Sequence, residues 1–166
     1  MIIRGRVIRY GDNVDTDVII PARYLKHGSD ASILRSHAME DLDPTFSERV
    51  KDRRILAAGR NFGCGSSREQ AVLALKYSGV ELIIAESFSR IFFRNSINLG
   101  LPLIELPEAW VIEDGDYVEA SLEEGVVMLP ERGITLKGRK LPDFMLEMIK
   151  AGGLIPYLRG LEGCRE

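Results

Sequence analysis

The pattern of apolar and polar positions divides the chain into three parts, of which the first looks irregular. Residues 2–10 alternate β-branched and basic side chains, which predicts a half-buried opening strand. A polar turn at 12–17 and an apolar run stopped by Pro21 come next. Two short helices are then expected, over about 29–39 with a cap at its start, and over 44–50. We expect these pieces to be peripheral.

The middle of the chain alternates strands with helices. Short, continuous apolar runs predict buried strands at 54–58, 80–85 and 101–106. Helical spacing of apolar residues predicts helices at 67–77 and at 89–99. Because strands that alternate with helices imply right-handed βαβ units around a parallel sheet, the expected fold class is α/β.

The last part of the chain changes character. Short β-like segments at 117–121 and 126–129, separated by glycines, predict antiparallel hairpins. A final helix is expected to start near Pro142 and to end at a pair of glycines, before a short segment at 157–158. Since the sequence shows no repeat, low-complexity tract or linker, residues 1–166 are expected to form a single domain.

Composition excludes several classes of protein. The 22 Lys and Arg residues against 25 Asp and Glu residues give a formal charge of −3 without a basic block, so no nucleic-acid partner is expected. No apolar stretch approaches the roughly 18 residues of a spanning helix, and arginines interrupt the first apolar run, so we expect a cytoplasmic protein without membrane contact. The two cysteines, Cys64 and Cys164, form no CxxC pair, which argues against a disulfide framework, a zinc site or an iron–sulfur cluster on this chain.

The glycine-rich segment 59–70, GRNFGCGSSREQ, is a candidate anion site. Its glycines let the backbone approach a ligand, Ser66 and Ser67 stand where a helix begins, and Arg68 offers a guanidinium that matches a carboxylate or phosphate. The two serines also have the capping-box spacing S-x-x-E/Q, so an ordinary helix cap explains them equally well. The segment lacks the P-loop, dinucleotide-binding and nucleophile-elbow patterns.

Two further groups of charged residues are weaker candidates. Asp12, Asp15 and Asp17 could line a site, but carboxylates in a turn usually accept hydrogen bonds from nearby backbone N–H groups, and the EF-hand pattern is absent. Arg90 and Arg94 lie four positions apart on one expected helix face and could attract an anionic partner, although a solvated face is the more frequent case.

Nucleophilic catalysis by this chain alone has little support. A serine hydrolase would need a histidine near the serine, and both histidines, His27 and His37, lie in the first, irregular part. Cys64 stands beside an expected helix start and could be reactive, but a small apolar filler is the commoner role for such a cysteine.

Two stretches taken together closely resemble a known family. DNVDTD at 12–17 running on to PARYL at 21–25, and NFGCGSSRE at 61–69 followed by ESFSRIFFRN at 86–95, resemble the small subunits of 3-isopropylmalate dehydratases in the aconitase family. Chain length and AGGL at 151–154 also fit, so the resemblance covers nearly the whole chain. It implies a swivelling β/β/α domain as in the aconitase C-terminal domain, with a central parallel or mixed sheet, flanking helices and a C-terminal β-hairpin region.

The resemblance implies a hydro-lyase subunit that is active only with a separate large subunit, in a heterodimer or heterotetramer. In this family the large subunit carries the [4Fe–4S] cluster, so no cofactor and no metal are expected on this chain. The substrate would be a small dicarboxylic or tricarboxylic acid, with 2-isopropylmalate and 3-isopropylmalate interconverted by dehydration and rehydration in leucine biosynthesis. Homoaconitate or another malate-type acid stays open as the substrate, and so does a non-catalytic, carboxylate-binding regulatory domain.

The family motifs also assign roles to residues of this chain. Ser66 matches the base that removes a proton from the carbon next to a substrate carboxylate, and Ser67 and Arg68 match contacts to that carboxylate. Asp17 matches an active-site aspartate that supports the same region. Lys26 lies in the loop where substrate choice resides, so its ammonium would pair with an extra carboxylate or its stem would line an apolar pocket.

Overall fold

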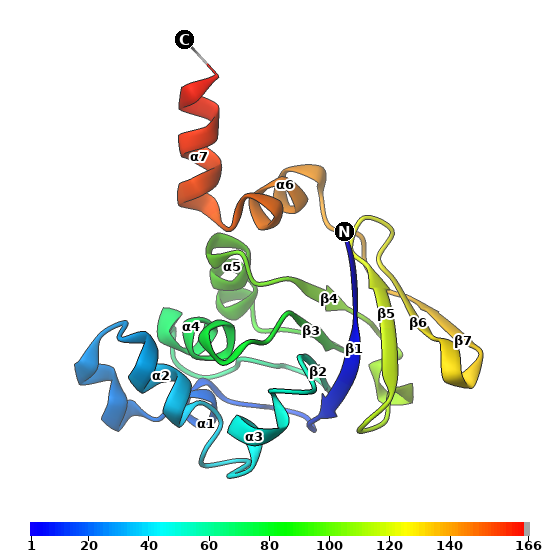
Figure 1. Ribbon diagram of the computed structural model, residues 1–166, viewed down its shortest axis with the longest axis horizontal. Helices are drawn as coiled ribbons and strands as arrows, with labels where there is room; N and C mark the ends of the chain where they lie inside the picture. Colours follow the sequence, from blue (N-terminus) through cyan, green and yellow to red (C-terminus); the bar gives the residue numbers. More distant parts are fainter. Residues whose placement is uncertain (165–166) are drawn as a thin grey trace.

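The first strand of the chain lies at the centre of a seven-stranded mixed sheet of order β4-β3-β2-β1-β5-β6-β7 (Figure 1). The strands are β1 (Ile2–Arg9), β2 (Ile55–Ala58), β3 (Leu82–Ala85), β4 (Leu103–Glu105), β5 (Tyr117–Ser121), β6 (Val126–Leu129) and β7 (Ile134–Lys137). The computed structural model describes residues 1–164, so positions 165–166 of the expected domain lie outside the described residues. β1 pairs parallel with β2, placing Val7 opposite Ile55, and antiparallel with β5 on its other side.

The parallel half of the sheet, β1 to β4, confirms the predicted α/β pattern. β2 and β3 are buried along their whole length, which explains why each reads as an uninterrupted apolar run. α4 (Glu69–Ser78) connects β2 to β3, and α5 (Arg90–Leu99) connects β3 to β4. The two helices lie side by side against one face of the sheet in Figure 1.

The segment between β1 and β2 contains four short helices that close one side of the core. They are α1 (Thr16–Ile19), the 3₁₀ helix η1 (Ala22–His27), α2 (Ala31–His37) and α3 (Phe46–Arg49). Asp30 provides the cap predicted at the start of α2, by accepting a hydrogen bond from the Ile33 N–H at 3.2 Å. The expectation that these pieces are peripheral is wrong, because α1 and α2 pack on α4, and Leu34 and Phe46 are fully buried.

The last part of the chain forms the predicted antiparallel strands and two helices. β5 and β6 lie where the sequence predicts them, and β7 is an additional strand that pairs with β6. α6 (Asp143–Ala151) begins directly after Pro142, as predicted. The segment after Gly152-Gly153 is not short, because it forms the ten-residue helix α7 (Leu154–Gly163), which projects from the body in Figure 1.

One continuous cluster of buried apolar residues, running from Ile3 to Ile149, joins the sheet and its helices. Among residues 1–164, no helix is long and apolar enough to cross a membrane.

Candidate active site

Three loops meet at the edge of the sheet where the parallel strands end. Since β1, β2 and β3 run parallel, the loops that follow them leave the sheet at the same edge, which is where α/β proteins bind ligands. Backbone hydrogen bonds join the loops: the Gly63 N–H donates to the Val14 carbonyl at 2.8 Å, and the Phe62 N–H donates to the Ser87 carbonyl at 3.0 Å. The segments 12–17 and 61–69, distant in sequence, are therefore held in direct contact.

Glycines are required where these loops touch. Gly65 has a φ of +94°, and a Cβ on it would lie 2.6 Å from a carboxylate oxygen of Asp15. Gly63 has a φ of +79°, and a Cβ there would collide with the ring of Phe92. Both positions combine a backbone conformation that favours glycine with a space that only glycine fits.

Two of the three candidate aspartates serve this loop geometry. The Asp15 carboxylate accepts a hydrogen bond from the Asp17 N–H at 2.7 Å and caps α1. The Asp12 carboxylate accepts one from the Arg60 N–H at 2.8 Å and so ties the first loop to the second. Both follow the ordinary behaviour of turn carboxylates, which leaves Asp17 as the candidate aspartate that contacts a predicted site residue.

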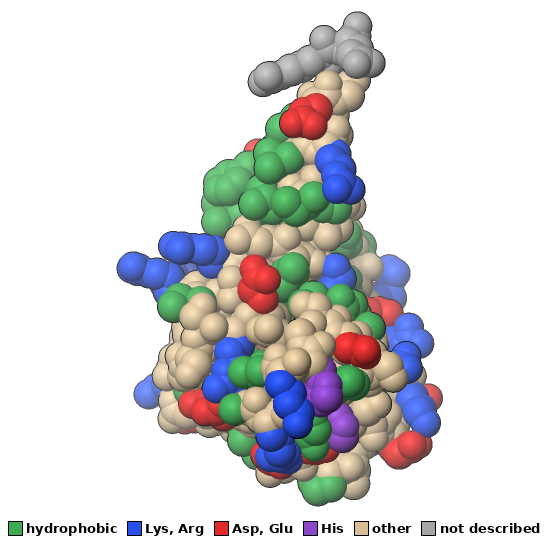
Figure 2. All heavy atoms as spheres, turned by 90° about the vertical axis from the view of Figure 1, so that its left-hand side faces the viewer, with side chains coloured by type: hydrophobic (Ala, Val, Ile, Leu, Met, Phe, Trp, Pro, Cys, Tyr) green, Lys and Arg blue, Asp and Glu red, His purple; other side chains and the backbone are tan. Residues whose placement is uncertain are grey.

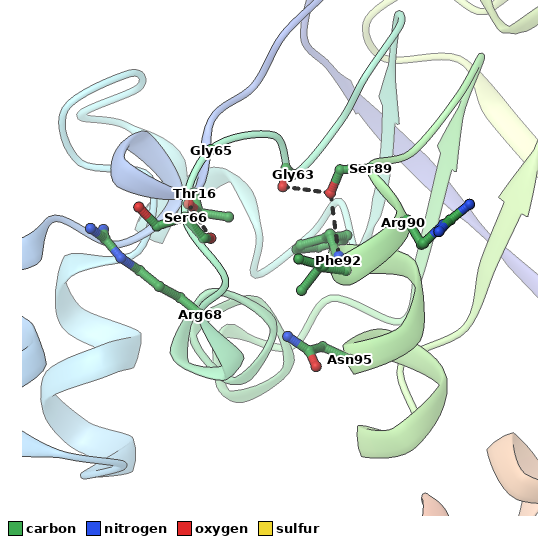
Figure 3. Close-up of a pocket in the computed structure, with 10 residues that line it drawn as sticks. Thr16, Gly63, Gly65, Ser66, Arg68, Ser89, Arg90, Phe92 and Asn95 are labelled. Carbon is green, nitrogen blue, oxygen red and sulfur yellow. Dashed lines mark hydrogen bonds between the residues drawn. The ribbon is translucent and has the colours of Figure 1, made fainter.

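The converging loops and α5 line a cavity of about 220 Å³ (Figure 3). In Figure 3, Ser66 and Arg68 lie on one side of the cavity, while Phe92 and Asn95 come from α5 on the other. The complete lining consists of Thr16, Gly63, Gly65, Ser66, Arg68, Ser89, Arg90, Ile91, Phe92 and Asn95.

Neither serine of the motif caps the helix that follows it. The N-cap residue of α4 is Arg68, and it gives no side-chain hydrogen bond to the first turn, so the possible capping box at Ser66 or Ser67 is absent. Instead, the buried Thr16 donates its hydroxyl hydrogen bond to the Ser66 carbonyl at 2.9 Å and fixes the backbone there. The Ser66 side chain thus stands exposed at the cavity, beside an uncapped helix start that favours negative charge.

Arg68 is held in place by Asp17. The guanidinium forms an ion pair with the Asp17 carboxylate and lies 3.4 Å from the Ile20 carbonyl, to which it donates. The Arg68 side chain is only 13% exposed, whereas the Asp17 side chain is 58% exposed. The structure therefore brings three predicted site residues together, with Ser66 and Arg68 at the cavity wall and Asp17 behind Arg68.

Ser67 and Lys26 lie elsewhere. Both are exposed, and neither is part of the cavity lining. Lys26 stands on η1, which is held against α2 by Tyr24: its ring stacks on His37 with centroids 3.8 Å apart, and its hydroxyl donates to Glu40 at 2.6 Å. In this arrangement the Lys26 ammonium does not reach the cavity.

Sequence reasoning missed part of the cavity. Thr16 and Ser89 each donate a hydroxyl hydrogen bond to a backbone carbonyl of the segment 61–69. The Ser89 hydroxyl donates to the Gly63 carbonyl at 2.8 Å and also caps α5. Asn95 lies about one turn after Ile91 and Phe92 on α5, on the face that lines the cavity. Arg90 and Arg94 are both exposed, as expected of a solvated helix face, and Arg90 also lines the cavity.

Cys64 gives no sign of nucleophilic reactivity, and the described residues contain no metal-binding group. Burial, together with the charge of the Asp15 carboxylate, raises the pKa of the Cys64 thiol above its usual value, which disfavours the nucleophilic thiolate. In the described part of the chain, no group of three or more His, Cys, Asp or Glu side chains is placed to hold a metal ion. An iron–sulfur cluster usually takes three or four thiolates, so the residues present here do not fit one.

Comparisons with known proteins show what the chain is similar to. Residues 26–109 match the model of the aconitase C-terminal domain. The chain is 55% identical to the 3-isopropylmalate dehydratase small subunit of Halothermothrix orenii, covering 96% of this chain and 97% of that protein. It is 52% identical to the 2,3-dimethylmalate dehydratase small subunit of Eubacterium barkeri, over 96% and 98% of the two chains. The crystal structure of a 3-isopropylmalate dehydratase from Methanocaldococcus jannaschii superposes with a TM-score of 0.93, at 44% identity, over 99% and 98% of the two chains.

Proposed function

Because the chain belongs to the aconitase C-terminal domain family, among the small subunits of 3-isopropylmalate dehydratases, we propose that it serves a hydro-lyase that interconverts 2-isopropylmalate and 3-isopropylmalate. The reaction removes water from one isomer and adds it back in the other orientation, as leucine biosynthesis requires. The observation that carries this proposal is the position of Ser66: its hydroxyl does not cap α4, and it lies at a cavity that Arg68 also lines.

This chain supplies the groups that bind the acid and move its proton. Arg68 binds a substrate carboxylate through its planar guanidinium. The exposed Ser67, next to Arg68 in the chain but outside the cavity lining, is kept as a further carboxylate contact on the family resemblance. Ser66 acts as an alkoxide: its deprotonated Oγ, stabilised by the start of α4 and by Arg68, takes the proton from the carbon next to that carboxylate. The electron pair of the broken C–H bond forms the double bond as hydroxide leaves the adjacent carbon. Negative charge that builds up on the carboxylate is stabilised by Arg68 and the start of α4.

The large subunit completes the enzyme. We assign the [4Fe–4S] cluster and the departure of hydroxide to that subunit, because this chain offers no ligand set for a cluster among its described residues. We further propose that residues 1–166 act as one domain in a cytoplasmic heterodimer or heterotetramer.

The lining of the cavity favours isopropylmalate over homoaconitate as the substrate. Ile91 and Phe92 give the cavity an apolar wall that suits an alkyl substituent. An additional carboxylate would need a cation near Ser66. Lys26, one candidate for that cation, lies outside the cavity, and the side chain of Arg90 points away from Ser66 in Figure 3. We therefore keep homoaconitate as the second candidate substrate.

Anaerobic reconstitution with the cognate large subunit tests the proposal. Hydration of isopropylmaleate, the unsaturated intermediate acid, should be fast with wild type and should fall by roughly 10²–10⁴-fold with Ser66→Ala. Ser29→Ala, which removes another exposed serine outside the cavity, should leave the rate unchanged. If Ser66→Ala turns over normally, Ser66 is not the base. If wild type binds the large subunit and the acid without turnover, a regulatory carboxylate-binding domain is the better description.

A further inference from the structure

A groove separates α5 from α6 next to the Ser66 cavity. Its volume is about 400 Å³, and it is lined by Arg90, Phe93, Arg94, Ile97, Asn98, Phe144, Met145 and Met148. The groove therefore has an apolar floor made of phenylalanine, isoleucine and methionine side chains, with guanidinium groups as its only charges. Flexible methionines beside aromatic rings are common in surfaces that receive another chain.

Apolar side chains continue from the groove onto α7. Phe144 at the groove is 54% exposed, and the three apolar side chains of α7 that are most exposed, Ile155, Leu158 and Leu161, are 44–57% exposed. No residue of α7 is buried within the described chain. Figure 2 shows hydrophobic side chains gathered over this tapering part of the molecule. An apolar surface of this extent marks an interaction site in a soluble protein.

Within residues 1–164, neither arginine of the groove forms an ion pair with an acidic side chain. Glu105, which shares a small neighbouring hollow with Arg90, pairs instead with Arg139 at 3.3 Å. Arg90 belongs to both the Ser66 cavity and the groove, and in Figure 3 its side chain points away from Ser66. Arg90 therefore marks a continuous rim between the cavity and the groove.

We propose that the α5–α6 groove and the exposed face of α7 form the docking surface for the large subunit. This inference rests on the proposed function, which requires a second chain to complete the cavity. Because Arg90 lines both hollows, a chain that closes over the cavity from the Arg90 side lies next to the groove. It would place apolar side chains on the groove floor and acidic side chains against Arg90 and Arg94.

A second copy of this chain fits the groove less well. A two-fold contact centred on the groove would bring Arg90 and Arg94 of both copies together, and like charges at an interface oppose association.

The junction of α6 and α7 packs closely on α5. The backbone of Gly153 approaches the end of α5 so closely that a Cβ on Gly153 would lie 2.5 Å from the Asn98 carbonyl oxygen. A partner seated on α6 and α7 is thereby positioned relative to both ends of α5.

Affinity for the cognate large subunit, measured by isothermal titration calorimetry on the full chain, tests the surface. Arg94→Glu and Phe144→Asp should each raise the dissociation constant at least tenfold, while kcat at saturating large subunit stays near that of wild type. Lys137→Glu on β7 and Trp110→Asp are matched controls and should not change the affinity. Lys137 is exposed, Trp110 is 66% exposed, and neither residue lines the cavity or the groove.

Hydrogen–deuterium exchange on the wild-type complex gives a readout that needs no variant. Amides of α5, α6 and α7 should gain protection when the large subunit is added. The inference is overturned if both groove variants bind as tightly as wild type, if the protection falls elsewhere, or if the variants change self-association of this chain instead. A wild-type complex that forms with protected α5–α7 but shows no hydration activity supports the docking surface and contradicts the proposed function alone.

Discussion

Asp17 and Arg68 form an ion pair in which the guanidinium is mostly buried and the carboxylate mostly exposed. Asp17 stands on the first turn of α1, and Arg68 is the N-cap residue of α4, so the pair joins the two family motifs across the junction of their loops. Since Asp17 is itself anchored through its N–H by Asp15, the pair fixes the direction of the guanidinium at the cavity wall. We therefore expect Asp17 to act as a positioning residue for Arg68.

Replacing Asp17 by Asn should lower kcat by about 100-fold with a smaller change in KM, because Arg68 keeps its charge but loses the group that orients it. Steady-state kinetics of the reconstituted enzyme measure the split, and Asp17→Glu should recover part of the rate. Stability should change little, since an ion pair with an exposed partner contributes at most about 1 kcal/mol. A large drop in the unfolding free energy with unchanged kcat would show that the pair is merely structural.

Arg68→Lys should raise KM roughly tenfold, since lysine keeps the positive charge but lacks the planar pair of N–H donors that matches a carboxylate. Initial rates over a range of isopropylmalate concentrations give this value. Arg60→Lys changes an arginine whose side chain is 78% exposed and pairs with Glu86 outside the cavity, so it should leave KM unaltered. Equal KM values for the two variants would remove Arg68 from carboxylate binding.

Lys26→Val should leave isopropylmalate turnover within about twofold of wild type, because Lys26 lies outside the cavity lining. Substitution of an exposed side chain away from a site usually has only a small effect. The same preparations should be assayed with homoaconitate. Homoaconitate activity in wild type that disappears selectively in Lys26→Val would mean that η1 moves to bring the ammonium to a third carboxylate, and isopropylmalate would then be the wrong substrate.

Gly65→Ala should cost about 1–3 kcal/mol of unfolding free energy and most of the activity, because the new methyl group would meet the Asp15 carboxylate at a φ of +94°. Gly79→Ala is a matched control. Gly79 has a φ of +101° at the end of α4, but nothing lies within 4 Å of the position of its Cβ. Urea unfolding should show the smaller loss for the control, with kcat unchanged; equal losses of stability and activity would assign both effects to the backbone conformation.

Acid should weaken the fold through Asp43. Burial alone would raise the pKa of Asp43, but hydrogen bonds from Thr45 and Tyr10 and the charge of Arg49 outweigh it and hold the pKa below its ordinary value of 3.8. A carboxyl whose pKa is lowered by folding stabilises the protein above the ordinary pKa, and the contribution disappears as the pH falls through the lower, folded value.

Asp43→Asn should therefore lower the unfolding free energy by about 2 kcal/mol at pH 7, where the carboxylate is charged and accepts these bonds. The difference between wild type and variant should shrink in urea titrations as the pH falls below 3.8. A difference that stays constant from pH 7 to pH 2 would contradict an electrostatic origin.

The parallel half of the fold was predictable from sequence because its buried strands have no solvated face and its helices end at glycines. β7 was missed because two of its four residues are exposed and polar, and α7 because nothing in it is buried. Local spacing could not distinguish a capping box from a free serine. Thr16, fifty positions before Ser66, holds the Ser66 backbone through a hydrogen bond to its carbonyl. The spacing of apolar residues does not reveal a contact between residues so far apart in sequence.

The position of β1 in the middle of the sheet has a consequence for the order of folding during synthesis. Every residue that lines the cavity precedes β4 in the chain, so β1 to β4 with their helices can assemble while the rest is still being translated. The opposite edge of β1 then stays unpaired until β5 leaves the ribosome, and an open edge invites pairing with other chains. We expect slow translation between β4 and β5 to promote aggregation of the nascent chain, although its cavity loops are already in place.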